Sequence, residues 1–148
     1  MTRLTPIVRD QRARGASSLW LPIARLCLSA VFLYSGATKL LFWSGAIEEF
    51  AALGLPAPTM AVAATITLQI GAGAALLIGW RSKPAALALA GFPVIATLIG
   101  HPFWAFDGAD FHRQLTTALE HLAIVGGLIT VAVVGPGPLS LQAQETAS

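Results

Sequence analysis

Two oppositely charged side chains stand inside otherwise apolar runs of the sequence and are the first candidates for chemistry. Lys39 lies about one helical turn before Trp43, and Glu120 lies about two turns after Arg113. Ionisable groups inside a membrane are costly, so they are functional candidates by default. Two interpretations stay open: a structural ion pair that fixes helix register, or the polar floor of a ligand pocket that opens outward.

Three further polar side chains join these two as candidate pocket residues. Gln69 lies near the middle of an apolar run, where an amide either contacts a ligand or bonds another helix, worth roughly 0.6–2 kcal/mol. His101 ends the next run. His121 follows Glu120 but points about 100° away around the helix, toward a different neighbour. The candidate pocket residues are therefore Lys39, Gln69, His101, Glu120 and His121.

The sequence contains no recognisable metal or haem motif. His101, His112 and His121 show no H-x-x-x-H spacing, and Cys27 is the single cysteine, inside an apolar run. Ser35 lacks the accompanying His/Asp pattern of a hydrolase. We therefore expect no metal site and no intrinsic cofactor. Histidines near the membrane surface, hydrogen-bonded to loop groups, are the expected arrangement.

The composition indicates that these candidates belong to a protein surrounded by lipid. Of the 148 residues, 55% are hydrophobic and 11% are charged, whereas a soluble domain carries about 25% charged residues. The excess apolar surface should face lipid. No basic patch with interleaved aromatic residues is present, so nucleic-acid binding is not expected.

Four apolar runs are each long enough to cross a bilayer, which takes about 20 residues. They predict an all-α membrane protein, a four-helix transmembrane bundle with spans at residues 20–43, 59–80, 84–104 and 111–134. A cleavable signal peptide is the alternative for the first run, but signal apolar regions have about 7–15 residues. Tryptophans, which favour the headgroup level, stand at four of the expected span ends: Trp20, Trp43, Trp80 and Trp104.

The flanking segments complete the expected organisation. Residues 1–18 are expected to be a flexible cytoplasmic tail, residues 19–138 the transmembrane domain, and residues 139–148 a polar C-terminal tail. A short interfacial helix is expected between Ala46 and Leu53. Small residues spaced four apart, which allow close helix packing, predict two contact stripes: Gly71, Ala75 and Gly79 in the second span, and Ala123 and Gly127 in the fourth.

Basic residues predict the orientation of the bundle. Four arginines precede the first span, and Arg81 and Lys83 stand in the turn between the second and third spans. The opposite side has only Lys39 and Arg113 near span ends. Cytoplasmic loops carry the excess of Lys and Arg. Both termini are therefore expected in the cytoplasm.

Several short motifs follow one another in a specific order through residues 20–141. They are Arg25-Leu26, Ser35-Gly36, Lys39-Leu40, Leu53-Gly54-Leu55-Pro56-Ala57-Pro58, Leu76-Leu77-Ile78-Gly79, His101, Phe103-Trp104, Ala123-Ile124-Val125-Gly126-Gly127 and Ser140-Leu141. In this order and spacing the chain resembles the DoxX/DoxD-like family of small bacterial and archaeal membrane proteins. It departs from the family pattern at Gln69, where the family usually has Glu, and at Glu120-His121, where a Lys or Asn pair is common.

The resemblance implies a redox-associated accessory subunit of the bacterial inner membrane, which interacts with quinone or with a membrane oxidoreductase. Family members are linked to thiosulfate oxidation, with electrons passed to quinone, and to quinone or catechol tolerance. Whether the chain is itself an enzyme stays open, and any quinone or redox centre is expected to be bound or to belong to a partner. The alternative is a non-catalytic scaffold or a small-molecule handling or transport protein. The lipid bilayer is the expected environment, and a homo-oligomer stays open.

Overall fold

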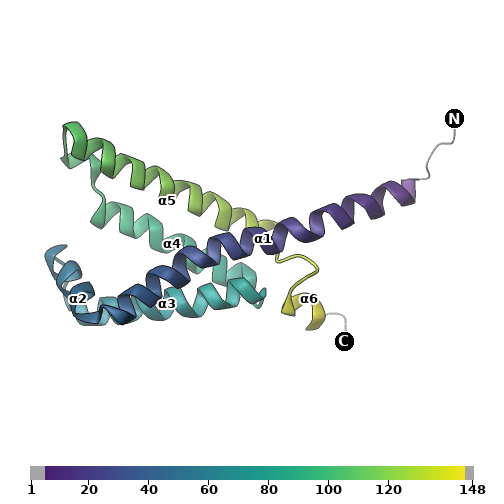
Figure 1. Ribbon diagram of the computed structural model, residues 1–148, viewed down its shortest axis with the longest axis horizontal. Coiled ribbons are helices and arrows are strands. Elements are labelled where there is room, and N and C mark those ends of the chain that lie inside the picture. The colour runs from purple at the N-terminus through teal and green to yellow at the C-terminus, as the bar shows by residue number, and fades with distance from the viewer. Residues whose placement is uncertain (1–5, 146–148) are drawn as a thin grey trace.

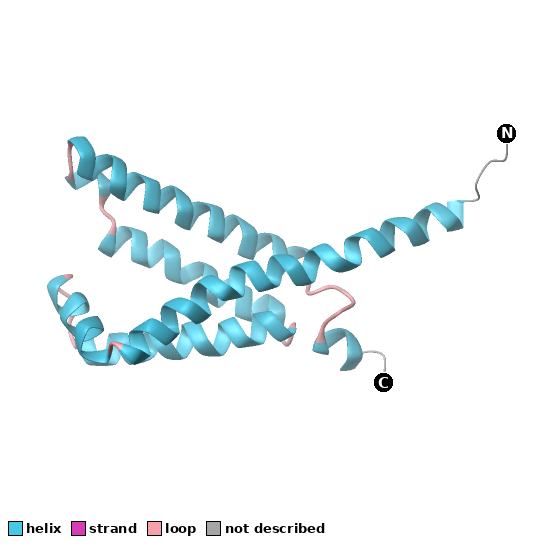
Figure 2. Ribbon diagram, in the orientation of Figure 1, coloured by secondary structure: helices cyan, strands magenta, loops and turns pink. Residues whose placement is uncertain are grey.

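The computed structural model describes the backbone of residues 6–145 and the side chains of residues 19–144. Within this part of the chain every regular element is a helix, and short connections join the helices (Figure 2). The helices are α1 Pro6–Leu41, α2 Trp43–Ala52, α3 Pro58–Ile78, α4 Ser82–Gly100, the 3-10 helix η1 Phe103–Ala105, α5 Gly108–Val134 and α6 Leu141–Glu145.

The all-α class and the four transmembrane helices predicted from the sequence are confirmed. The helical stretches long and apolar enough to cross a membrane are Leu19–Leu41, Pro58–Ile78, Ser82–Ala105 and Gly108–Val134. The proposed interfacial helix is present as α2. Proline and left-handed residues mark the boundaries: Pro58 begins α3 after Ala57, whose φ is 58°, and Gly79 ends α3 with a φ of 73°.

The helical part of the chain is longer at both ends than the sequence indicated. Helix α1 begins at Pro6, inside the segment expected to be a tail, and its first turns project beyond the other helices (Figure 1). Helix α6 lies within the expected C-terminal tail. The flexibility and the cytoplasmic location of these segments stay predictions.

The four spans pack as two pairs. Helix α1 packs along α3, α4 packs along α5, and α3 packs against α4. Figure 1 shows the first turns of α1, helix α6 and the α3–α4 turn toward one end of the bundle, which we call the terminal end. Helix α2 and the α4–α5 connection lie at the opposite end, which we call the loop end. Gly127 of α5 contacts Leu28 of α1, whereas toward the loop end α1 and α5 diverge (Figure 1).

The largest group of buried apolar side chains holds all four spans together. Phe32, Leu76, Leu89, Leu128 and Val131 are each at most 2% exposed and form its centre. A smaller cluster at the loop end joins α2 to α3 through Ala46, Val62 and Ile66. Because α5 takes no part in this second cluster, space is left between the helix pairs at the loop end.

Only some of the small residues that were expected to form contact stripes lie where two helices meet. Gly36 of α1 lies against Gln69 and Ile70 of α3, and Gly73 lies against Leu33. A Cβ placed on Gly71 would have no atom of a neighbouring segment within 4 Å. The prediction that Gly71 belongs to a packing stripe was therefore wrong, because Gly73, about 160° away around the helix, faces α1 instead.

The C-terminal segment returns across the terminal end and ties three parts of the chain together. The backbone N–H of Gln142 donates to the carbonyl of Gly79, 3.2 Å away. The buried guanidinium of Arg25 donates through Nη2 to the carbonyl of Leu139. The hydroxyl of Ser140, itself buried, donates to Gly137 at 2.7 Å. These bonds fasten the C-terminal segment to α1 and to the end of α3.

Candidate functional site

A pocket of about 550 Å³ lies at the loop end, bounded by α1, α2, α3, α4 and one residue of α5. Its polar lining gathers side chains from separate segments of the chain: Ser35, Lys39, Glu49, His101 and His121. We call it the loop-end pocket. Its place follows from the packing, because the bundle core closes the terminal end while the two helix pairs diverge here.

Lys39 supplies the cationic group of the loop-end pocket. Its Nζ donates to Ser35 Oγ, one turn earlier in α1, at 2.8 Å. The ammonium is half-buried and is attracted by the carboxylate of Glu49 in α2. An ammonium has three N–H donors, and this single bond to Ser35 leaves donors that can serve a ligand oxygen.

Two histidines form the opposite polar side of the loop-end pocket. The ring centroids of His101 and His121 are 5.4 Å apart, with an interplanar angle of 70°. His101 Nδ1 lies 2.8 Å from Gln114 Oε1, and His121 Nδ1 lies 2.7 Å from Thr97 Oγ1. An amide oxygen only accepts, so His101 donates from Nδ1, and in the neutral ring Nε2 is left as an acceptor.

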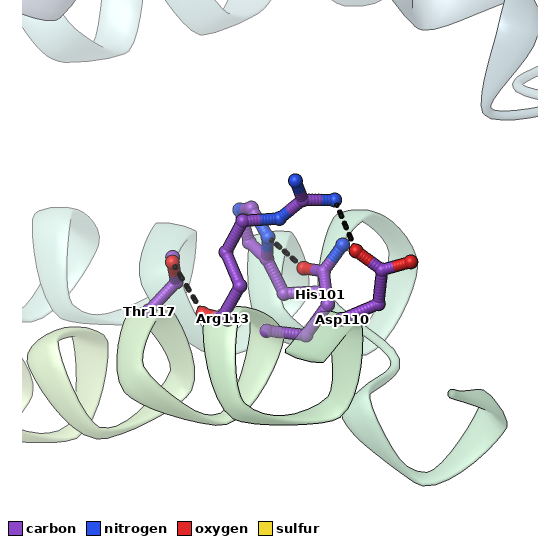
Figure 3. A network of polar contacts seen from close by, with 5 residues as sticks. His101, Asp110, Arg113 and Thr117 are labelled. Atoms are coloured by element: carbon purple, nitrogen blue, oxygen red, sulfur yellow. Dashed lines mark hydrogen bonds and ion pairs between the residues drawn. The ribbon is translucent and has the colours of Figure 1, made fainter. Parts of the chain in front are cut away.

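The histidine pair adjoins a polar surface at the start of α5. Figure 3 shows His101 below the Arg113–Asp110 ion pair, whose Nη2 and Oδ1 atoms are 3.0 Å apart. Both members of that ion pair are mostly exposed. Thr117 donates to the carbonyl of Arg113, one turn earlier. The His101 side of the loop-end pocket is thus continuous with the solvent-accessible end of α5.

Apart from Thr65, the remaining side chains that line the loop-end pocket are apolar. Aliphatic and aromatic side chains come from α2, from the α2–α3 connection, from α3 and from α4: Phe50, Leu53, Leu55, Leu68, Phe92, Ile95 and Ile99. Ligand sites commonly combine apolar walls with a few convergent polar groups. The pocket therefore suits a molecule with a flat or branched apolar body and one or two oxygen atoms.

Gln69 is buried between α1 and α3 rather than in the lining of the loop-end pocket. Its side chain is 1% exposed, and a Cβ placed on Gly36 would lie 3.2 Å from Gln69 Cβ. Gln69 Oε1 is buried and has no hydrogen-bond partner among the described residues. The expected hydrogen bond from another helix to this amide oxygen is therefore not made within that part of the chain.

Glu120 does not meet Lys39. Among the side chains of residues 19–144 no ion pair joins these two residues, and Figure 1 shows α4 between the end of α1 and the first half of α5. The expectation that Glu120 points into the bundle was wrong, because its side chain is exposed. Helix α5 packs through Leu128 and Val131, and this rotation brings His121 rather than Glu120 to the pocket.

Of the candidates chosen from the sequence, the structure thus brings together Lys39, His101 and His121. Sequence reasoning missed Glu49 as a partner for Lys39, and it missed Thr97 and Gln114 as the residues that hold the histidines. It also missed the bond from Lys39 to Ser35, for which the spacing of four residues was a usable signal. Within the described residues no group of three or more His, Cys, Asp or Glu side chains could hold a metal ion.

The four spans and the pocket between them define an integral membrane protein with a candidate ligand site at the loop end. The family model described as DoxX matches residues 20–102, which is more than half of the 148 residues. The chain therefore belongs to the DoxX family. This assignment confirms the resemblance found in the sequence motifs.

Two curated relatives of the chain come from Escherichia coli strain K12. The inner membrane protein YphA is 25% identical over 127 residues, which cover 86% of this chain and 91% of YphA. The inner membrane protein YqjF is 28% identical over 119 residues, which cover 80% of this chain and 86% of YqjF. No solved structure shows significant similarity to the chain. The relatives support a place in the inner membrane.

Proposed function

We propose that the protein is a membrane accessory subunit that binds a quinone headgroup in the loop-end pocket and works with a membrane oxidoreductase. The observation that supports this proposal is the pocket itself, about 550 Å³ between the spans, with Lys39 on one side and the His101–His121 pair on the other. A quinone ring is apolar on its faces and carries carbonyl oxygens at its edge. It is therefore complementary to apolar walls with separate polar groups.

The side chains provide the contacts that both redox forms of such a ligand need. Lys39 Nζ can donate to a quinone carbonyl, and His101 Nε2 can accept from a quinol hydroxyl. Reduction of a quinone to a quinol takes two electrons and two protons. We assign the two electrons to the partner oxidoreductase, as the family resemblance implies, and the two protons to solvent water. The chain's own residues then hold the ring and orient its oxygen atoms.

Binding of a short-tailed benzoquinone to the purified chain in mild detergent tests this proposal by isothermal titration calorimetry. We expect Lys39→Met to weaken binding of the benzoquinone, and His101→Phe to weaken binding of the corresponding quinol, each at least about tenfold. This is the effect of losing one hydrogen bond to a charged group or one buried polar contact. Glu120→Gln is the control, since Glu120 is polar and lies outside the pocket. Absence of binding by the wild-type chain, or equal loss in the control, would overturn the proposal.

The alternative function is a non-catalytic scaffold or a small-molecule handling protein. Native purification of the Lys39→Met chain distinguishes the two functions. If an oxidoreductase co-purifies with this variant and keeps its quinone-linked activity, the result favours the alternative. The mass of the protein–detergent complex in the same preparation reports whether the chain is a homo-oligomer. We also infer from the basic residues that both termini are cytoplasmic and that the loop-end pocket opens toward the outer side.

A further inference from the structure

A second hollow of the molecule lies at the terminal end, far from the loop-end pocket. It is a surface groove of about 560 Å³ between the α3–α4 turn and the C-terminal segment. Its lining consists of Trp80, Arg81, Lys83, Pro84 and Gln142. We call it the terminal groove. The side chain of Arg81 reaches this groove beside the exposed ring of Trp80, and Lys83 provides its second cation.

The backbone orients the cationic groups of the terminal groove. Arg81 adopts a left-handed conformation with a φ of 44° as the residue before α4, and its guanidinium carbon lies 5.4 Å from the centroid of the Trp80 ring. The first amide groups of α4 have no partner within the helix and form the positive end of its dipole. The groove therefore combines two side-chain cations with a helix N-terminus.

A third positive charge lies against Gly79, the residue before Trp80. Arg25 is 3% exposed, and its guanidinium packs so closely on the backbone of Gly79 that a Cβ there would clash with Nη1. The guanidinium donates to Leu139, while its Nε and Nη1 atoms are buried without a partner among the described residues. A buried cation with incomplete hydrogen bonding is costly unless an opposite charge lies nearby.

The described side chains do not supply that opposite charge. Among residues 19–144 no carboxylate forms an ion pair with Arg25. Acidic side chains in this range lie in α2, in the α4–α5 connection and in the first half of α5, all away from the α3–α4 turn: Glu48, Glu49, Asp107, Asp110 and Glu120. Over the same range the charged side chains at the terminal end are therefore all positive, and Arg25 keeps unused hydrogen-bond donors.

From this charge pattern we propose that the terminal groove binds the phosphate group of an anionic glycerophospholipid. Trp80 places the groove at the headgroup level of the membrane. The exposed apolar side chains of Ile78, Leu139 and Leu141 line a separate hollow beside the C-terminal segment, and we place the start of the acyl chains of the same lipid there. Arg81 and Lys83 contact the phosphate, and Arg25 contributes its field from beneath Gly79.

Native mass spectrometry of the full chain in detergent tests the proposal with two probes, phosphatidylglycerol and phosphatidylcholine of equal chain length. We expect wild-type protein to retain phosphatidylglycerol at least about tenfold more tightly. Each surface charge near a membrane contributes about fivefold in binding. The Arg81→Gln/Lys83→Gln variant should therefore lose about 25-fold in phosphatidylglycerol affinity. Arg113→Gln, an exposed arginine at the loop end, is the matched control and should retain wild-type binding.

A second variant tests the positive charge of the groove as a whole without removing Arg25, whose loss could prevent folding. Gln142→Glu keeps the backbone bond to Gly79 and places a carboxylate beside the groove. We expect it to lower the preference for phosphatidylglycerol about as much as the loss of one cation. Equal retention of the two lipids by wild-type protein, or an equal effect of Arg113→Gln, would overturn the proposal. Displacement of phosphatidylglycerol by millimolar inorganic phosphate would assign the groove to free phosphate and overturn the lipid assignment.

Discussion

Gly36 of α1 is packed against Ile70 of α3 so closely that a Cβ on the glycine would lie 2.8 Å from Ile70 Cγ1. Real Cβ contacts do not become this short, so any larger residue requires the Ile70 side chain or the two helices to shift. Gly36 lies about one turn before Lys39 of the loop-end pocket, and on α3 it also faces the buried Gln69. The distance between α1 and α3, and with it the shape of the pocket, depends on this glycine.

Gly36→Ala should destabilise the folded protein by about 1–3 kcal/mol, the usual cost of forcing a methyl group into a packed contact. Gly71→Ala is the control, because a Cβ there meets no atom of a neighbouring segment and alanine favours helix over glycine. Thermal unfolding in detergent, followed by circular dichroism, compares the two. Equal midpoints for both variants would contradict the close α1–α3 contact.

Gly79→Ala should be more harmful than Gly54→Ala, although both glycines have nearly the same left-handed backbone. Their φ angles are 73° and 74°, so each variant incurs the left-handed penalty of roughly 1–2 kcal/mol. Only at Gly79 does the new methyl group clash with Arg25 and Ser140. We expect Gly79→Ala to unfold at a lower temperature and to release the C-terminal segment to limited proteolysis. Similar proteolysis of both variants would argue against the packing of Arg25 on Gly79.

Gln69→Leu should leave the stability unchanged or raise it by up to about 1 kcal/mol. The amide oxygen is buried without a partner among the described residues, and replacing an unsatisfied buried acceptor by an apolar group of similar shape removes its desolvation cost. Thr67→Val, in the same helix but exposed, provides the comparison. A loss above about 1 kcal/mol in Gln69→Leu, measured by the same unfolding assay, would show that the amide has a partner in the membrane-embedded protein.

The proposed topology predicts which residues are labelled from outside the cell. In a Cys27→Ser background, Asp107→Cys in the α4–α5 connection should react with a membrane-impermeant maleimide in intact cells. Lys83→Cys in the first turn of α4 should react only after the cells are broken, since this basic end of the helix is expected in the cytoplasm. The reverse labelling pattern would place both termini and the terminal groove on the outer side.

The sequence was sufficient to predict the class and the spans. Long apolar runs, tryptophans at their ends and prolines between them each indicate the same four helices, and the structure has them within a few residues. The continuation of α1 back to Pro6 was not predicted, because polar residues 6–18 show no apolar period. The signal that the sequence pattern uses is an apolar face, and the residue types of 6–18 supply none.

The site was predicted less well, for a reason specific to membranes. In water an apolar stripe identifies the face of a helix that turns inward, but lipid is as apolar as the protein core. The rotation of α5 could therefore not be obtained from its residues, and Glu120 was expected inside while it is exposed. Lys39 was identified because a cation near the end of a span is a candidate whichever face of the helix carries it. The contact between Gln114 and His101, 13 residues apart, depends on the α4–α5 connection and has no local signal.

The bond between Arg25 and Leu139 has a consequence for biosynthesis. The two residues are separated by 114 positions in the chain, so the acceptor is synthesised only after all four spans have been made. Until then the first span must enter the membrane with a cation that lacks this partner. The translocation machinery therefore has to tolerate Arg25 while residues 26–138 are synthesised, and the Arg25 contact at the terminal end can form only after Leu139 has emerged.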